Sequence, residues 1–266
     1  MNPGGRSVSE ALSSDLDTVR RWLREARRVA VLTGAGMSAE SGVPTFRDAL
    51  TGLWSQYDPQ KLATEEGFRA DPALVWNWYR SRREQIARVQ PNAGHVALAA
   101  FAQRHPSRLT LITQNVDGLH QRAGSPGVLA LHGNIDQDRW LDDCAMPQRL
   151  GGGCAPASAE PGEPPRCATC GNLVRPAVVW FGEKLPVQVL QQAEAASRAC
   201  DLMLVVGTSG EVWPAAGLAH TAREAGARVV VLNPEPSSLD GVAHLQLRAT
   251  AAGALPLLLV GESSGC

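Results

Sequence analysis

The sequence lacks an excess of charge of either sign, and it has no long apolar run. It holds 25 basic and 26 acidic residues among 266, a formal net charge of −1. A chain with so balanced a charge is not expected to present a basic face to nucleic acid. Its longest apolar runs, residues 202–206 and 255–260, are too short to cross a bilayer, and residues 1–10 lack the apolar stretch of a secretion signal. The composition therefore predicts a cytoplasmic protein that binds neither nucleic acid nor membranes.

Cysteine is also scarce, and its six positions are unevenly spread. Four of them, Cys144, Cys154, Cys167 and Cys170, lie close together in the sequence. In a cytosolic chain such a cluster indicates a metal site rather than a disulfide framework. The C-x-x-C-G spacing of residues 167–171 is typical of a zinc knuckle.

Short runs rich in Val, Ile and Leu alternate with helical patterns along most of the chain. Continuous runs of this kind are typical of strands buried on both faces. The predicted strands are residues 29–32, 109–112, 128–131, 202–206 and 229–232, and the predicted helices are residues 93–103, 187–199 and 215–225. This alternation predicts an α/β fold with a doubly wound parallel sheet.

Three stretches fall outside the alternation. Residues 1–13 are rich in Gly, Ser and Pro, which predicts disorder, and a helix is expected to begin at Ser14. Residues 46–91 carry helical patterns without a strand, and residues 136–174 are rich in Gly, Pro and Cys. We expect both to be insertions that together form a smaller lobe. The sheet domain would then comprise residues 14–45, 92–135 and 175–260.

Polar residues follow the predicted strands at the point where each strand ends. The first strand runs into a G-x-G-x-x-A segment, where glycines allow a pyrophosphate to approach the backbone at a helix N-terminus. Such a segment is equally typical of a tight turn, and the loop-like residues 41–48 after it do not suit an ordinary dehydrogenase. Residues 113–117, 132–134, 207–209 and 233 follow other strands. Each alone could be a turn or a cap, but together they predict a ligand crevice at the carboxyl edge of the sheet.

Five of these motifs, in their order along the chain, resemble the signature of the sirtuin family. They read GAGMSAESGVPTFR from Gly34, TQNVD from Thr113, LHGN from Leu131, VVWFGE from Val178 and GTS from Gly207. The resemblance spans roughly residues 29–259. It implies an NAD-dependent protein lysine deacylase, with a Rossmann-like NAD-binding domain and a small domain that has a helical module and a zinc-binding module. Its partners would be acyl-lysine proteins bound as extended peptides.

The resemblance also implies a role for each of the matching residues. In the family, the acyl oxygen attacks the nicotinamide ribose and expels nicotinamide. A ribose hydroxyl then attacks the acyl carbon and needs a base to take its proton. Histidine suits that task near neutral pH, and His132 is the matching residue. Asn115 and Asp117 match the positions that organise the nicotinamide ribose and its pocket. The NAD-binding positions implied are Gly34, Ala35, Gly36, Ser38, Ala39, Glu40, Pro44, Thr45, Phe46, Arg47, Gln114, Asn115, Val116, Asp117, Gly207, Thr208, Ser209, Asn233 and Ala251. The substrate peptide is expected as an added strand along Val178, Val179, Trp180, Phe181 and Gly182.

A second constellation concerns the acyl group. Tyr79 and Arg82 are three residues apart in a helical stretch and therefore share a helix face. In the family branch that removes succinyl and malonyl groups, a Tyr-x-x-Arg pair binds the acyl carboxylate, and the small Ala63 matches the position that leaves room for a longer chain. A phenol and a guanidinium suit a carboxylate. The alternative interpretation is a half-buried tyrosine beside solvated arginines.

The metal site departs from the family pattern. The family usually has a first C-x-x-C about eight residues after the catalytic histidine, where this chain has Trp140 and Asp143. One structural zinc held by Cys144, Cys154, Cys167 and Cys170 is expected, and the alternative is a degenerate site that binds no metal. Two other functions stay open: a mono-ADP-ribosyltransferase, and an NAD-sensing module without turnover. The intact His132, Asn115 and Asp117 argue against the second.

Overall fold

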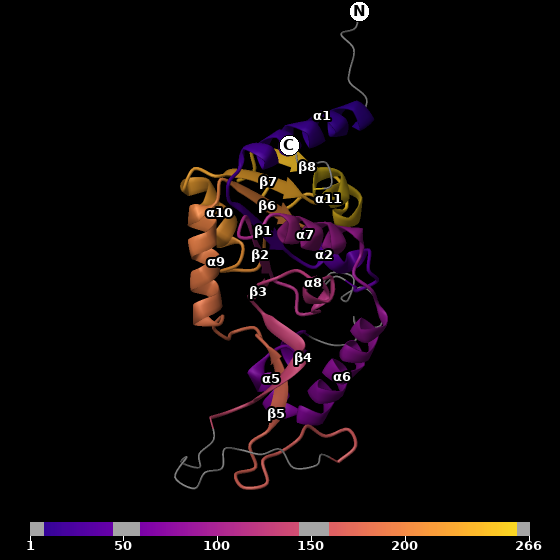
Figure 1. Ribbon diagram of the computed structural model, residues 1–266. Coiled ribbons are helices and arrows are strands. Elements are labelled where there is room, and N and C mark those ends of the chain that lie inside the picture. Colours follow the sequence, from indigo (N-terminus) through magenta and orange to yellow (C-terminus); the bar gives the residue numbers. More distant parts are fainter. Residues whose placement is uncertain (1–7, 45–58, 144–159, 260–266) are drawn as a thin grey trace, which may run out of the picture.

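A central sheet of six parallel strands organises the chain. The computed structural model describes residues 8–44, 59–143 and 160–259. The strands are arranged in the order β3-β2-β1-β6-β7-β8 (Figure 1). Their bounds are β1 Val29–Thr33, β2 Leu109–Thr113, β3 Leu129–Ala130, β6 Leu202–Val206, β7 Arg228–Leu232 and β8 Leu245–Leu247. The predicted α/β fold with a parallel sheet is therefore confirmed.

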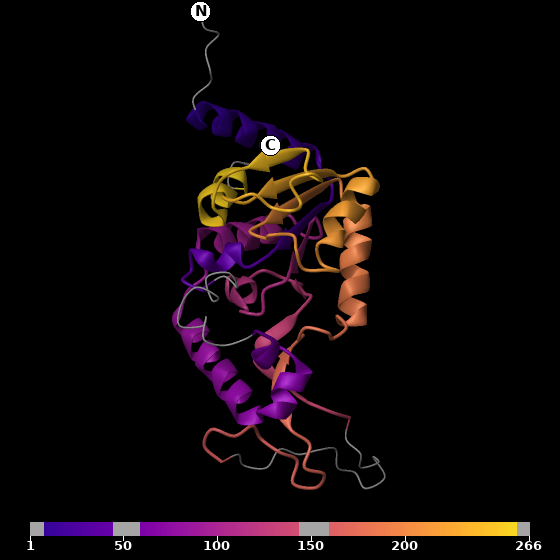
Figure 2. The ribbon, with the colours of Figure 1, turned by 180° about the vertical axis from the view of Figure 1, so that it is seen from behind.

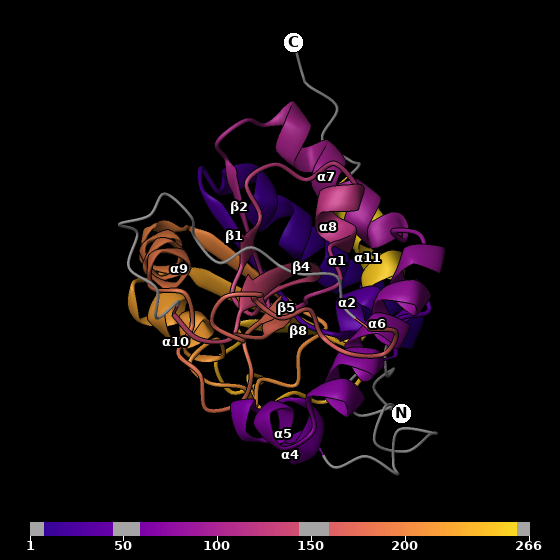
Figure 3. The ribbon, with the colours of Figure 1, turned by 90° about the horizontal axis from the view of Figure 1, so that it is seen from below.

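Helices cover both faces of the sheet, because the central strands are apolar on both sides. In β1, Val29 and Val31 pack into one core with α1, α7 and α11, while Ala30 and Leu32 face a second core with α9 and α10. Figures 2 and 3 show these helices on opposite sides of the sheet. The bounds are α1 Val8–Glu25, α7 Ala93–Arg104, α9 Val187–Ala199, α10 Gly217–Glu224 and α11 Ala251–Leu259.

A smaller lobe lies beyond the carboxyl edge of the sheet (Figure 1). Its described residues form an antiparallel strand pair and three helices: β4 Gly133–Trp140, β5 Val174–Val178, α4 Pro59–Leu62, α5 Glu65–Ala70 and α6 Pro72–Arg88. The helices and strands share one apolar core that includes Phe68, Val75, Ile135 and Trp180. Two short helices, α2 Gly36–Ala39 and α8 Leu119–Arg122, begin shortly after β1 and β2 on the side facing this lobe.

The structure differs from the sequence expectations at several boundaries. Helix α1 begins at Val8, inside the stretch expected to be disordered and before the predicted start at Ser14. Leu12, one turn before the expected body of the helix, packs against the core and helps explain the longer helix. Residues 175–178, which the expected boundaries assign to the sheet domain, belong to β5 and pair with β4 in the smaller lobe. No helix within the three described ranges is long and apolar enough to cross a membrane.

Candidate active site

The loops after β1 and β6 touch so closely that only glycine fits between them. A Cβ on Gly34 would lie 2.7 Å from Cβ of Thr208, and one on Gly36 would lie 2.8 Å from Cα of Gly207. Gly207 has a φ of +62°, and a Cβ there would clash with the amide nitrogen of Met37. Ala35 and Ala39 flank these contacts in the turn and helix of α2. The turn at the start of α2 thus lies at the sheet edge without side chains in the way, which leaves room for a pyrophosphate to approach the backbone.

Ser38, Asn115 and Asp117 form one hydrogen-bonded cluster below this turn. The Ser38 hydroxyl donates to Oδ2 of Asp117 over 2.7 Å, and it accepts from Nδ2 of Asn115 over 3.1 Å. Asn115 also donates to the carbonyl of Gly34, over 3.0 Å. Burial raises the pKa of Asp117, opposed by the hydrogen bonds from Ser38 and the Leu119 amide. The cluster holds a buried polar carboxyl group at the end of β2.

Two buried histidines extend the cluster, and neither was predicted from the sequence. The Asn92 amide donates to Nδ1 of His95, so His95 presents Nε2–H toward Ser38, 3.5 Å away. The His120 ring lies 4.7 Å from the His95 ring, and its Nε2 is 3.0 Å from the Thr33 hydroxyl. Burial lowers the pKa of His95 to about 4 and that of His120 to about 3. A histidine three residues after a helix cap was the only sequence signal for His95.

His132 lies at the junction between the two lobes. Its Nδ1 is 2.9 Å from the carbonyl oxygen of Gln114. A carbonyl can only accept, so Nδ1 carries the proton and Nε2 keeps its lone pair. Burial lowers the pKa of His132 below the ordinary histidine value, which favours the neutral ring. The side chain is therefore set up to take a proton through Nε2.

The segment expected to hold the peptide lies directly beside His132. The Val179 amide donates to the His132 carbonyl over 2.9 Å, and Val178 is paired with Gly133. On its other side the segment meets the small lobe, because the Phe181 amide donates to the Ala63 carbonyl over 2.8 Å. Phe181 is about half exposed, and Gly182 has a φ of +85°. The backbone of this segment thus connects the proposed base to the expected acyl pocket.

Tyr79 and Arg82 share one face of α6, as the spacing predicted. Tyr79 is buried, and its hydroxyl oxygen accepts from Nε1 of Trp180 over 2.9 Å. The Arg82 guanidinium lies over the Trp78 ring, 5.3 Å from its centroid. Burial lowers the pKa of Arg82, and among the described residues no carboxylate forms an ion pair with it. The neighbouring Arg80, by contrast, is exposed.

The remaining expected NAD positions have varied surroundings. Thr208 accepts from Nε2 of Gln114 over 3.1 Å, and Asn233 donates its side-chain amide to the Glu235 carbonyl over 2.8 Å. Glu40 accepts from the Ala252 amide over 2.7 Å, so its carboxylate caps helix α11 next to the buried Ala251. Three further positions complete this set: Val116, whose carbonyl accepts from the Ile135 amide; Ser209, whose carbonyl accepts from the Ser238 amide; and the exposed Pro44.

Several expected site residues lie outside the described ranges. They are Thr45, Phe46 and Arg47 of the NAD loop and Cys144 and Cys154 of the metal site. The other two cysteines sit in a tight turn: the Gly171 amide donates to the Cys167 carbonyl over 2.9 Å, and Gly171 has a φ of +72°. Such a turn suits a C-x-x-C zinc knuckle. Within the described residues alone, no group of three His, Cys, Asp or Glu could hold a metal ion.

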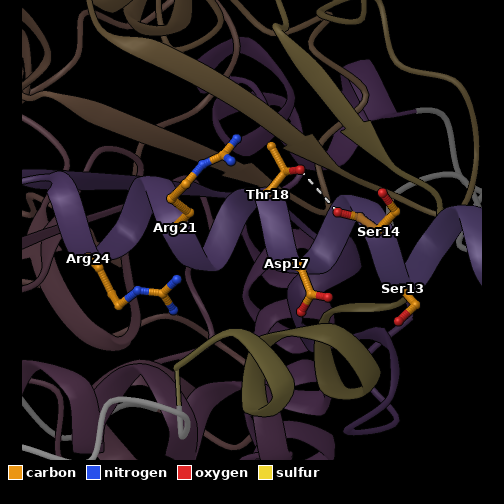
Figure 4. Close-up of a pocket in the computed structure, with 6 residues that line it drawn as sticks. All are labelled: Ser13, Ser14, Asp17, Thr18, Arg21 and Arg24. Atoms are coloured by element: carbon orange, nitrogen blue, oxygen red, sulfur yellow. Dashed lines mark hydrogen bonds between the residues drawn. The ribbon is translucent and has the colours of Figure 1, made fainter.

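The hollow drawn in Figure 4 is unrelated to this arrangement. Its six lining residues, from Ser13 to Arg24, all belong to helix α1, which packs on the sheet away from the small lobe (Figures 1 and 4). None of them is an expected site residue. The candidate site is therefore at the carboxyl edge of the sheet, between the two lobes.

Comparisons with known proteins relate the chain to one family. The model of the Sir2 family matches residues 34–214. An NAD-dependent protein deacylase of Ralstonia nicotianae is 57% identical over 90% of this chain and 94% of its own length. A solved complex of a Sir2 homologue with NAD covers 98% of this chain and 95% of its own, with a TM-score of 0.78 and 36% identity. A solved Sir2–p53 peptide–NAD+ complex covers 90% and 95%, with a TM-score of 0.74 and 30% identity.

Proposed function

The chain belongs to the Sir2 family and is an NAD-dependent protein deacylase, and from this premise we propose that it prefers acyl groups that carry a carboxylate, such as succinyl and malonyl. One observation carries the preference. Arg82 and Tyr79 share one face of α6, and within the described ranges no carboxylate forms an ion pair with the Arg82 guanidinium, although the charge of Asp117 acts on it from a distance. A half-buried guanidinium without an ion-pair partner is costly, and an acyl carboxylate would reduce that cost.

The route from the sheet edge to this pocket supports a single substrate site. Val178–Gly182 would hold the peptide as an added strand through main-chain hydrogen bonds, next to the His132 carbonyl. Ala63, whose carbonyl accepts a hydrogen bond from the Phe181 amide, would lie beside the acyl chain. The acyl group would then extend toward α6, where Tyr79 and Arg82 lie.

In the reaction we propose, NAD is a co-substrate that lies along the turn after β1. Asn115 and Asp117, fixed by Ser38, would position the nicotinamide ribose. Once nicotinamide has left, Nε2 of His132 would take the proton of a ribose hydroxyl as that hydroxyl attacks the acyl carbon. Gln114 would support this step by holding Nδ1–H of His132. One water molecule would then complete the cleavage of the acyl C–N bond, so that NAD, acyl-lysine and water give free lysine, nicotinamide and O-acyl-ADP-ribose.

A structural zinc belongs to the same proposal. Cys167 and Cys170 would supply two thiolates from their turn, and Cys144 and Cys154 would supply the others. The metal would stabilise the small lobe and take no part in the chemistry. The expected division into a NAD-binding domain and a small domain, and the cytoplasmic location, stay predictions.

Replacing Arg82 tests the acyl preference. Arg82→Met should raise the KM for a succinyl-lysine peptide on the order of 10- to 100-fold, because a desolvated carboxylate loses its charged partner. The KM for the acetyl-lysine peptide should rise far less, since acetyl carries no charge. Steady-state kinetics on both peptides measures the difference.

Arg80→Met is the matched control, because Arg80 lies on the same helix but is exposed. Arg80→Met should change the KM for neither peptide. If Arg82→Met lowered turnover of both peptides equally, Arg82 would be a structural residue, and plain deacetylation would replace the proposed preference.

A further inference from the structure

The oxygen of the Tyr79 hydroxyl accepts a hydrogen bond, but its proton is not donated to any described residue. A phenol has one proton to donate and an oxygen that accepts. Nε1–H of Trp180 donates to that oxygen over 2.9 Å, and an indole cannot accept in return. Within the described residues no acceptor receives the Tyr79 proton. Burial raises the pKa of Tyr79 to about 12, so the proton stays on the oxygen at neutral pH.

Trp180 itself is held rigidly from three sides. It is 2% exposed, and the Phe68 ring lies 5.3 Å from its own. The Arg175 guanidinium, 1% exposed, lies 3.3 Å from the centroid of the indole ring. Glu183 pairs with Arg175 and also accepts from the Trp180 amide over 2.9 Å. A ring fixed in this way can hold its N–H in one direction.

The direction of the Trp180 N–H matters because it decides which way Tyr79 can donate its own proton, and Arg82 is the next donor on the same face of α6. Residues i and i+3 are neighbours on a helix, and the positive charge of Arg82 acts on Tyr79. With its oxygen turned to Trp180, Tyr79 has its O–H left to donate elsewhere. A phenol proton and a guanidinium together form a two-donor site for a carboxylate.

We propose that Trp180 is the positioning residue of the acyl pocket: its indole N–H occupies the Tyr79 oxygen and so directs the Tyr79 proton to the carboxylate of an acidic acyl group. Trp180 thereby sets acyl specificity without touching the reacting atoms. The inference rests on the proposed function, since it assumes that an acyl carboxylate meets Tyr79 and Arg82.

The test compares Trp180→Phe with the wild-type enzyme on succinyl-lysine and acetyl-lysine peptides of one sequence. Phenylalanine keeps an aromatic ring over Arg175 but lacks the N–H. The ratio of the succinyl KM to the acetyl KM should rise about fivefold, the loss expected for one hydrogen bond. The kcat for the succinyl peptide should change less than its KM, because the acyl carboxylate is remote from the bond that breaks. Trp22→Phe, the same change on helix α1, should leave the ratio unaltered.

A double-mutant cycle separates positioning from packing. Tyr79→Phe should raise the same ratio about tenfold, because it removes a hydrogen bond to a charged group. The Tyr79→Phe/Trp180→Phe variant should match Tyr79→Phe alone, since Trp180 acts only through the hydroxyl. Should Trp180→Phe fail to fold by its melting curve, Trp180→Leu, which also lacks a donor, takes its place in both comparisons.

The outcomes distinguish this inference from the proposed function. Equal losses on both peptides, or additive effects in the double variant, would overturn the positioning role and leave Trp180 as a packing residue. If Arg82→Met also left the succinyl-to-acetyl ratio unchanged, the proposed acyl preference itself would fail. A changed ratio in Arg82→Met with an unchanged ratio in Trp180→Phe rejects the role of Trp180 alone.

Discussion

At the scale of single residues, the chemistry depends on how protons are assigned within short hydrogen-bonded chains. The Gln114 carbonyl fixes the tautomer of His132, and the Asn92 amide fixes that of His95. The Gln114 carbonyl could not be identified from the sequence as a tautomer-setting group, because only the fold brings it near His132, whereas the Asn92 amide lies three residues before His95 in a helix cap. The sequence suggested candidate residues for the site, but it pointed neither to His95 and His120 nor to the groups that donate and accept the protons.

Replacing the proposed base should separate the two halves of the reaction. His132→Ala should lower the rate of deacylation on the order of 10²- to 10⁴-fold, the usual loss for a general base. Exchange of labelled nicotinamide into NAD should be retained better, because the base acts after nicotinamide has left. Deacylation within a few-fold of the parent enzyme would show that another group takes the proton.

At the scale of elements, the strands were predictable where they are buried on both faces. The stretch 202–206 was predicted with its observed bounds, and helix 187–199 likewise. Strand β8 escaped prediction because it has three residues at the sheet edge, and β4 escaped because residues 136–139 are exposed and polar. The hydrophobic pattern of a sequence reflects burial, so it does not reveal strands that have few buried residues.

The cysteine turn of the small lobe leads to a prediction about metal. Cys167→Ala should lower the zinc content of the purified protein from about one equivalent toward zero and should lower its melting temperature as well, since structural zinc supplies folding free energy. Elemental analysis and thermal melting measure the two quantities. Cys200→Ala is the control, because burial raises the pKa of that thiol to about 11 and it lies in the sheet domain. A Cys167→Ala variant with parental melting and activity would mean that the cluster binds no functional zinc.

At the scale of the whole molecule, the buried histidine pair should make folding stability depend on pH. The pKa of His95 is lowered to about 4 and that of His120 to about 3, against an ordinary value of 6.5. A lowered folded-state pKa contributes stability that is complete above pH 6.5 and is lost as the pH falls toward the folded values. The raised pKa of Asp117 acts in the opposite direction.

Urea unfolding between pH 7 and pH 5 should show this dependence. The free energy of unfolding should fall with a slope approaching about 1.4 kcal/mol per pH unit for each of the two histidines. His120→Gln should reduce this slope by about 1.4 kcal/mol per pH unit, the contribution of one bound proton. A free energy of unfolding that stays constant from pH 7 to pH 5 would mean that these rings titrate normally in the folded protein.

The central claim is that this NAD-dependent deacylase prefers acyl groups with a carboxylate, and one measurement tests it most directly. Peptides of one sequence carrying acetyl-, malonyl- or succinyl-lysine are incubated with NAD and the wild-type enzyme, and mass spectrometry follows free lysine peptide and O-acyl-ADP-ribose. We predict a higher kcat/KM for the malonyl and succinyl peptides than for the acetyl peptide, with one nicotinamide released per acyl group removed. A higher kcat/KM for acetyl would contradict the account, as would ADP-ribose bound to a protein acceptor without loss of the acyl group.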